Sequence, residues 1–275
     1  GAGPAGLRFA ATAARRGHEV GVFERRESAG GHLAALAFLP ARQGWTVAIN
    51  DLLHQCQDAG VRFAFGQEIT RRQPLPGEWD AVVVATGSGW DLTGNVSARY
   101  DRAGIPGLQP EHTLTPEDAI EALRRDPALP LGGSVMILDG VGTYLPLGLA
   151  DLLTARGARV ELVTPLEMLG RLSSGEQETP HILPKLFARD FATHIACDVE
   201  RVAGRVVWLR SIWGGAERCI EGIDSIVLAT ARTVDETPYR ELCERHAAVH
   251  RIGDCVSPRP LEAVVFEAEQ LARRL

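Results

Sequence analysis

The stretch G-A-G-P-A-G, from Gly1 to Gly6, decides the fold of this chain. In a strand–turn–helix unit, the first glycine permits the tight turn, the second lets the backbone approach a pyrophosphate, and the third lets the helix pack closely on the strand. Apolar residues then recur at helical spacing as far as Arg16, and Gly17 provides a stop signal. Since such a turn follows a buried strand, we expect the first strand to lie outside this sequence and the chain to be a piece of a larger protein.

The next segment, residues 19–24, predicts a strand that ends on an acid. Glu24 lies about 20 residues past the glycines, where a dinucleotide-binding unit carries the carboxylate that binds the ribose. We therefore predict that role for Glu24 in preference to a solvated charge, and nucleotide binding in preference to a glycine turn without a ligand. The predicted contacts of this unit are Gly1, Gly3, Pro4, Ala5, Gly6, Glu24 and, as a candidate phosphate ligand, Arg25.

The composition is that of an ordinary globular protein, with 45% hydrophobic and 23% charged residues in 275. A net charge of −6 argues against binding to nucleic acid or to an anionic membrane. No apolar run reaches the roughly 18 residues of a membrane helix. The five cysteines form no C-x-x-C pair and have no histidine cluster nearby, which argues against a metal site, an iron–sulfur cluster or a disulfide framework. We expect reduced thiols and a cytoplasmic location.

A second strand–helix–strand unit begins with the apolar strand S-V-M-I-L-D at residues 134–139. Its loop, D-G-V-G-T-Y-L at residues 139–145, carries Leu145 where the third glycine should stand. The strand that follows ends on Thr164, so no carboxylate is offered to a ribose. We therefore expect a degenerate or empty unit in preference to a working NAD(P) site. Tyr144 either fills the space of a nicotinamide nucleotide or is a packed loop aromatic.

Local signals mark the other elements. T-P-E-D at residues 115–118 predicts a helix start with Thr115 as the cap, and short strands from Ala196 onward predict a meander. We predict an α/β fold with two Rossmann-like βαβ units, the first of them without its first strand. The predicted domains are a discontinuous nucleotide-binding domain, residues 1–110 plus 223–275, and a degenerate NAD(P)-binding-like domain, residues 111–222.

Two dinucleotide units, together with A-T-G at residues 85–87 and I-G-D at residues 252–254, resemble the two-dinucleotide-fold flavoprotein superfamily, the relatives of glutathione reductase. The resemblance covers nearly the whole chain. It implies that the first unit binds the ADP half of FAD and that Asp254 hydrogen-bonds the ribitol; as an alternative, Asp254 caps the helix that follows. It also implies cofactor contacts from Ala85, Thr86 and Gly87.

A closer likeness is to the C-terminal part of the trimethylamine dehydrogenase and histamine dehydrogenase group, within the old-yellow-enzyme family that also contains dienoyl-CoA reductase. It rests on G-G-H-L-A with Pro40 and Arg42, W-D-A-V-V-V-A-T-G, L-T-P-E-D, S-I-W-G-G and I-G-D-C-V-S-P-R. The likeness implies that FAD or ADP is bound, with contacts from Gly31, His32, Leu33 and Arg42. The group's FMN, 4Fe-4S cluster and amine-binding residues belong to an N-terminal barrel and the segment after it, so none is expected in this chain.

Three hypotheses follow. In the first, the chain is the FAD- or ADP-binding region of an FMN/iron–sulfur amine dehydrogenase-like oxidoreductase, inactive alone and without catalytic or metal-binding residues of its own. Its expected partners are an adenine nucleotide, the missing barrel and, as a candidate, an electron-transfer flavoprotein. The second is an FAD-dependent NAD(P)H oxidoreductase of the dienoyl-CoA reductase type, and the third is a structural module that binds nothing. We also expect the isolated chain to be poorly soluble, because a missing central strand exposes its neighbours.

Overall fold

The computed structural model describes residues 1–96, 102–126, 128, 131–173 and 177–275. The chain forms two compact units. The first comprises Gly1–Ala37, Arg42–Gly89 and Arg232–Leu275, and the second comprises Phe38–Ala41 and Trp90–Ala231. These units change over near residues 89 and 231, whereas the domain boundaries predicted from the sequence lie at 110 and 222 and stay a prediction. The short strands β4 (Gly89–Trp90) and β13 (Arg232–Thr233) pair where the chain passes between units.

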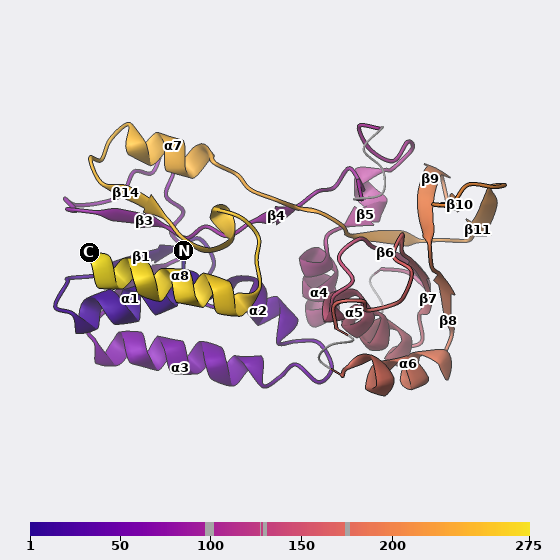
Figure 1. The fold of residues 1–275 in the computed structure, drawn as a ribbon, viewed down its shortest axis with the longest axis horizontal. Helices are drawn as coiled ribbons and strands as arrows, with labels where there is room; N and C mark the ends of the chain where they lie inside the picture. The colour runs from indigo at the N-terminus through magenta and orange to yellow at the C-terminus, as the bar shows by residue number, and fades with distance from the viewer. Residues whose placement is uncertain (97–101, 127, 129–130, 174–176) are drawn as a thin grey trace. The chain divides into compact units, whose positions relative to one another are not determined.

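The first unit is built from helices and two small parallel sheets (Figure 1). Besides β13 and part of β4, it contains α1 (Pro4–Arg15), β1 (Gly21–Glu24), α2 (Gly31–Leu36), α3 (Trp45–Asp58), β2 (Arg62–Phe65), β3 (Val82–Val84), α7 (Thr237–Cys243), β14 (Val249–Arg251), the 3-10 turn η3 (Gly253–Cys255) and α8 (Leu261–Arg274). Strand β1 pairs in parallel with β2, and β3 pairs in parallel with β14.

Helix α1 is the centre of the first unit, because it contacts both α3 and α8. Its start follows the expected pattern, with Gly3 at the N-cap and Pro4 in the first turn, where a missing N–H costs nothing. Small residues on α1 let its neighbours approach closely. At Gly253, for example, an added Cβ would lie only 2.8 Å from the Cβ of Ala5. The same contact area includes Ala268 of α8, which is fully buried. The first turn of α1 is therefore closely packed against η3 and α8.

The second unit contains a parallel sheet of five strands in the order β5-β12-β6-β7-β8. Its elements are η1 (Pro110–His112), β5 (Thr113–Leu114), α4 (Pro116–Arg125), β6 (Ser134–Asp139), α5 (Tyr144–Ala155), β7 (Arg159–Val163), α6 (Thr179–Phe187), β8 (Phe191–His194), β9 (Cys197–Ala203), β10 (Val206–Ser211), β11 (Arg218–Glu221) and β12 (Ser225–Ala229). Strands β9, β10 and β11 form a separate antiparallel sheet, the meander expected from the turn spacing.

The buried residues of the second unit show how its helices and its two sheets pack on one another. Every residue of β6 is buried, as a strand covered on both faces requires. One apolar cluster joins Met136 and Leu138 of β6 to Val207 and Leu209 of β10, while α4 and α5 contact the sheet strands β12, β6 and β7. The predicted α/β fold with two Rossmann-like units is confirmed. Among the helices in the described ranges, none has the length and apolar character needed to cross a membrane.

Candidate functional site

The glycines of the opening turn differ in what surrounds them. A Cβ on Gly1 would overlap the carbonyl oxygen of Ala85, and a Cβ on Gly6 would overlap that of Gly1. These two glycines are needed because backbone segments approach each other closely. A Cβ on Gly3 would meet no described atom within 4 Å, and Gly3 has an ordinary φ of −74°. Packing therefore does not require a glycine at position 3, which leaves open space beside the first turn of α1.

The first turn of α1 directs unpaired backbone donors toward that space. The amides of Ala5 and Gly6 have no partner within the helix, because they lie in its first turn, while Leu7 already donates to the Gly3 carbonyl at 2.9 Å. The helix dipole adds a positive partial charge at the same end. Pro4 has no N–H and places no donor there. This arrangement suits an anion such as a phosphate.

The carboxylate of Glu24 lies beside the same turn, although only 8% of the residue is exposed. Its Oε2 accepts the amide of Ala2 at 2.7 Å, and its Oε1 accepts the amide of Arg26 at 2.9 Å. Glu24 is the last residue of β1, so the parallel strand delivers it to the edge where the glycine turn lies. Each oxygen keeps further acceptor capacity for a ligand hydroxyl.

The glycine pair after β1 packs against the opening turn. The amide of Gly30 donates to the Ala2 carbonyl at 2.8 Å, and a Cβ on Gly31 would lie 3.3 Å from the Cα of Gly3. Both glycines have positive φ, 113° and 54°, so a side chain would be strained there as well as crowded. Gly31 therefore borders the open space beside Gly3.

The loop after β3 approaches the same region. His32 Nε2 lies 2.7 Å from the carbonyl oxygen of Ser88, a contact in which the imidazole must donate. Gly87, with φ of 77°, places its Cα hydrogen toward His32, whose Nε2 would lie 3.8 Å from an added Cβ. The A-T-G segment and the G-G-H segment, far apart in the sequence, thus meet through His32.

Asp254 belongs to a polar cluster that the sequence did not reveal. Its Oδ2 accepts the hydroxyl of Ser88 at 3.3 Å and lies 3.7 Å from the guanidinium of Arg232. Arg232 also donates to the Ser88 hydroxyl at 2.9 Å. The backbone amide of Arg259 donates to Asp254 Oδ1 at 3.3 Å, so the carboxylate touches the segment before α8 as well as the A-T-G loop.

Sequence reasoning missed Ser88 and Arg232, although a signal for both existed. An Ala-Thr pair stands at the end of each of the strands β3 and β12: residues 85–86 follow β3, and residues 229–230 begin with the last residue of β12. Polar residues directly after such a pair lie at the carboxyl edge of a sheet, where ligands bind. Ser88 and Arg232 come two residues after each pair and bond to one another.

The structure brings most of the predicted site residues to the carboxyl ends of β1, β3 and β14, and their binding roles stay predictions. Leu33 is the buried residue of α2. Thr86 is exposed, and so is Arg25. Arg42 lies just before α3, where its carbonyl accepts the amide of Trp45 at 3.0 Å.

The corresponding loop of the second unit is occupied by a side chain of its own. Asp139 Oδ1 accepts the amides of Val141 at 3.0 Å and Gly142 at 2.7 Å, and the residue is fully buried. Burial raises the pKa of Asp139 to about 6, while the two backbone hydrogen bonds act in the opposite direction. Its Oδ2 has no hydrogen-bond partner within the described part of the chain. The amides that would face a phosphate therefore already bind a carboxylate.

The start of α5 is also filled by protein atoms. Tyr144 is the first residue of this helix, is 8% exposed and donates its hydroxyl to the Pro40 carbonyl at 2.5 Å. Its ring lies against Gly148, where an added Cβ would approach within 2.6 Å. Thr164, at the end of β7, is fully buried and donates to the Asp139 carbonyl at 2.7 Å. Tyr144 is thus packed within its own unit.

Comparisons with known proteins agree with this architecture. Residues 1–49 match the family described as NAD(P)-binding Rossmann-like domain. The chain is 27% identical to dimethylamine dehydrogenase of Hyphomicrobium sp. (strain x), over 100% of the chain and 41% of that protein. It is 32% identical to a probable N-methylproline demethylase of Rhizobium meliloti (strain 1021), over 99% of the chain and 42% of that protein.

Among solved structures, the chain is similar to the 6-hydroxypseudooxynicotine amine oxidase of Pseudomonas geniculata N1. The TM-score is 0.89 and the identity 26%, over 100% of the chain and 41% of that structure. The chain thus spans about 41% of the length of the relatives it matches, which are longer proteins. These matches confirm the resemblance to the amine dehydrogenase group.

Proposed function

We propose that the chain is the nucleotide-binding region of a longer amine dehydrogenase-like oxidoreductase. The proposal rests on the similarity to dimethylamine dehydrogenase and related proteins, which covers the whole of this chain. It binds an adenine nucleotide, either ADP or the ADP part of FAD, at the first turn of α1. One observation carries the proposal: the Glu24 carboxylate is bonded to the Ala2 amide, beside the open space that Gly3 leaves at the start of a helix.

The pyrophosphate is held by backbone amides. Ala5 and Gly6 supply donors that the helix itself does not use, and the absence of a Cβ on Gly3 lets a phosphate oxygen come close. Gly31, packed on Gly3, keeps the opposite wall free of side chains. These features account for a ligand with two adjacent phosphates better than for a single carboxylate.

The ribose is held by Glu24. A carboxylate accepts two hydroxyl groups of a sugar, and the Ala2 and Arg26 amides fix its orientation before the ligand arrives. In this proposal the role of Asp254 depends on whether FAD or ADP is bound. With FAD, the cluster of Asp254, Ser88 and Arg232 borders the part of the cofactor beyond the pyrophosphate; with ADP, the same cluster joins β3 to the segment before α8.

The second unit does not bind a pyridine nucleotide in this proposal. The Asp139 carboxylate takes the loop amides of Val141 and Gly142, so a phosphate would have to displace a buried side chain. Two negative groups would also compete for the same donors. This observation supports an amine dehydrogenase-like role over the alternative NAD(P)H oxidoreductase, which requires a working second unit.

Redox chemistry belongs to the rest of the longer protein. Within the described residues, no group of His, Cys, Asp and Glu side chains has the arrangement of a metal site. We assign no catalytic residue to this chain. In this proposal FMN, a 4Fe-4S cluster and the amine pocket belong to a preceding barrel of the longer protein, and an electron-transfer flavoprotein is the candidate acceptor.

The test is to replace Gly3 by valine and to identify released nucleotide. Purified protein is denatured, and the supernatant is analysed by mass spectrometry, which separates ADP from FAD. Gly3→Val should lower nucleotide occupancy by about tenfold or more, because a side chain fills the pyrophosphate space. The free energy of unfolding in urea should fall only by the cost of valine at a helix cap, because an added Cβ meets no described atom within 4 Å.

Gly44→Val is the matched control. Gly44 is the N-cap of α3, has φ of −57°, and likewise has no described atom within 4 Å of an added Cβ. The two variants share the cost of placing valine at a helix cap, so only the ligand effect differs. Wild-type protein that releases no adenine nucleotide, or equal occupancy in both variants, would contradict the proposal.

A further inference from the structure

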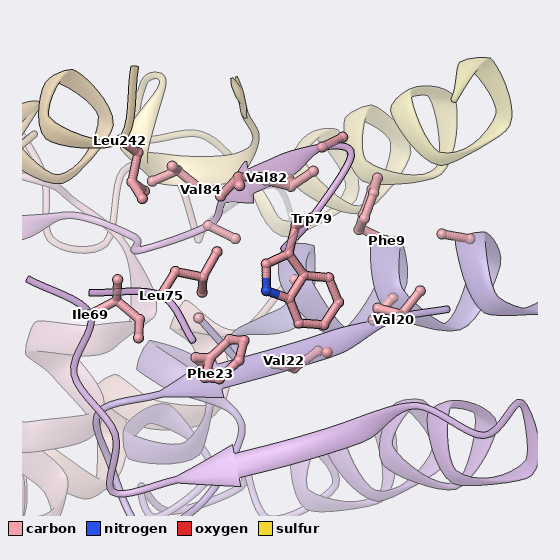
Figure 2. Close-up of a pocket in the computed structure, with 18 of the residues that line it drawn as sticks. Phe9, Val20, Val22, Phe23, Ile69, Leu75, Trp79, Val82, Val84 and Leu242 are labelled. Atoms are coloured by element: carbon pink, nitrogen blue, oxygen red, sulfur yellow. The ribbon is translucent and has the colours of Figure 1, made fainter. Parts of the chain in front are cut away.

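Two features border helix α1 besides the proposed nucleotide site. The first is a cavity of about 720 Å³ between β1 and β3, around which Figure 2 shows apolar side chains such as Phe9 and Val22. The strand expected before Gly1 would lie there, so the cavity is not a further ligand site. The second is helix α8, which directs two carboxylates, those of Glu267 and Glu269, toward other elements of the same unit.

Glu267 ties η3 and the segment after it to helix α8. Its Oε2 accepts the backbone amide of Gly253 at 2.7 Å and the guanidinium of Arg259 at 2.6 Å. Gly253 is the first residue of η3 and is buried, so its amide needs an acceptor from the protein. The Glu267 carboxylate supplies that acceptor and thereby fixes the start of η3 to α8.

Gly253 lies directly against the first turn of α1. A Cβ added at Gly253 would lie 2.8 Å from the Cβ of Ala5, and Gly253 has a positive φ of 74°. No side chain separates the two segments, so the backbone of η3 itself packs on the turn. The amides of Ala5 and Gly6 are the donors assigned to the pyrophosphate. A displacement of Gly253 would therefore alter the packing of the turn that carries these donors.

Glu267 also orders the surroundings of Asp254. The backbone amide of Arg259 donates to Asp254 Oδ1 at 3.3 Å, while the guanidinium of the same arginine donates to Glu267. The Arg259 Nε also donates to the Ser257 carbonyl at 3.1 Å. One carboxylate thus fixes both the residue before Asp254 and the residue whose amide Asp254 accepts.

The charge of Glu267 is balanced by an adjacent cation. An unpaired carboxylate close to a bound pyrophosphate would repel it. The guanidinium of Arg259 lies 2.6 Å from Glu267 Oε2, so the two side chains form an ion pair without net charge. Both are partly exposed, which keeps the cost of removing them from water small. Glu267 can therefore accept the Gly253 amide without weakening an anion site.

Glu269, two residues further along α8, makes a different contact. Its Oε2 accepts the hydroxyl of Thr12 at 2.5 Å and lies 2.9 Å from the Nε of Arg8. Both partners lie on α1 beyond its first turn, and neither carries a donor assigned to the phosphates. Glu269 therefore fastens α8 to the body of α1, whereas Glu267 fastens it to η3.

We propose that Glu267 is a positioning residue for the bound nucleotide. By accepting the Gly253 amide and the Arg259 guanidinium, it holds residues 253–254 against the first turn of α1, in the arrangement that the pyrophosphate requires. The inference rests on the proposed nucleotide site. Glu267 acts through Gly253 and Arg259 and makes no contact of its own with the ligand.

The test compares Glu267→Ala with Glu269→Ala in purified protein freed of nucleotide. Each variant removes one hydrogen-bonded carboxylate from the same helix, so both should lower the urea midpoint by similar amounts. Calorimetric titration with ADP, the part common to both candidate ligands, gives the dissociation constant. Glu267→Ala should raise this constant about tenfold, because the Gly253 amide loses its acceptor. Glu269→Ala should change it by less than about threefold.

Glu267→Gln tests whether an acceptor at this position is sufficient. Its side-chain carbonyl still accepts the Gly253 amide, so the dissociation constant for ADP should stay within about threefold of wild type. Hydrogen exchange without nucleotide gives a second readout. The Gly253 amide should exchange about tenfold faster in Glu267→Ala than in wild type, and at the wild-type rate in Glu267→Gln and Glu269→Ala.

Three results would overturn the positioning role. They are a dissociation constant in Glu267→Ala equal to that of wild type, equal weakening in Glu267→Ala and Glu269→Ala or in Glu267→Ala and Glu267→Gln, and unchanged exchange at Gly253. In each of them wild-type protein still binds ADP, so the nucleotide site itself stands. Wild-type protein that does not bind ADP would instead refute the nucleotide site, and this inference with it.

Discussion

An acid lies near the helix-starting loop in each unit, but the two acids occupy different positions and accept different backbone amides. Glu24 ends β1 and accepts the amide of Ala2, which belongs to the neighbouring glycine turn. Asp139 ends β6 and bends back onto the amides of its own loop. The Asp139 side chain is short and lies directly before its loop, so it reaches the amides of that loop. The Glu24 side chain is longer and lies on the strand after the glycine turn, so it reaches that turn from outside. The position of the acid thus decides whether a loop keeps its donors for a ligand.

Asp139→Asn should alter how stability depends on pH. Burial raises the pKa of Asp139 to about 6 from the ordinary 3.8, so the folded state binds a proton that the unfolded state has released between these values. Stability from this group is therefore present at low pH and is lost as the pH rises through about 6. Relative to the variant, wild type should lose roughly 1 kcal/mol between about pH 5 and about pH 7.5.

Urea unfolding at the two pH values measures this difference. Asp58→Asn, on the exposed end of α3, serves as the control, because removing an exposed carboxylate should shift stability by much less. A gap between wild type and Asp139→Asn that stays constant with pH would contradict the account of Asp139.

At the scale of elements, local sequence signals fixed the ends of helices. The Thr115 side chain accepts the Asp118 amide at 3.0 Å, and the Asp118 carboxylate accepts the Thr115 amide at 3.3 Å, so α4 starts with the cap that T-P-E-D predicted. Helix α1 ends at Arg15, close to the predicted Arg16, and Gly17 follows with φ of 100°. Such signals act over a few residues, which is why the sequence alone reveals them.

Thr115→Ala should destabilise the second unit by about 1 kcal/mol, because the Asp118 amide at the start of α4 loses the Thr115 hydroxyl that accepts it. Thr115→Ser keeps the hydroxyl and should retain most of that stability. The measurement is the urea midpoint of the transition reported by residues of the second unit. Equal losses in the alanine and serine variants would show that the hydroxyl cap is not responsible.

At the scale of the whole molecule, the two units differ in the size of their parallel sheets. The second unit has five parallel strands in one sheet, whereas β1 and β2 of the first unit form one pair, and β3 and β14 form another. Two-stranded sheets are only marginally stable by themselves. The poor solubility expected for the isolated chain stays a prediction.

Urea should therefore unfold the chain in two steps, the first unit before the second. Adding ADP should shift only the first step, by about 2.7 kcal/mol at a concentration of roughly 100 times the dissociation constant, because the ligand binds the folded first unit. Circular dichroism follows both steps, and hydrogen exchange assigns each to its unit. A single transition, or a shift of the later step, would contradict the assignment of the ligand to the first unit.

The sequence by itself determined the glycine turn, the helix it starts, the strand that ends on Glu24, and the loss of the fingerprint at Leu145. Each depends on the spacing of residues close together in the chain. Only the tertiary structure revealed the cluster of Ser88, Arg232 and Asp254, because its members come from three distant segments and meet through strand order. It also showed that the Asp139 carboxylate accepts the amides of its own loop, because this depends on how the loop after β6 folds back onto the carboxylate.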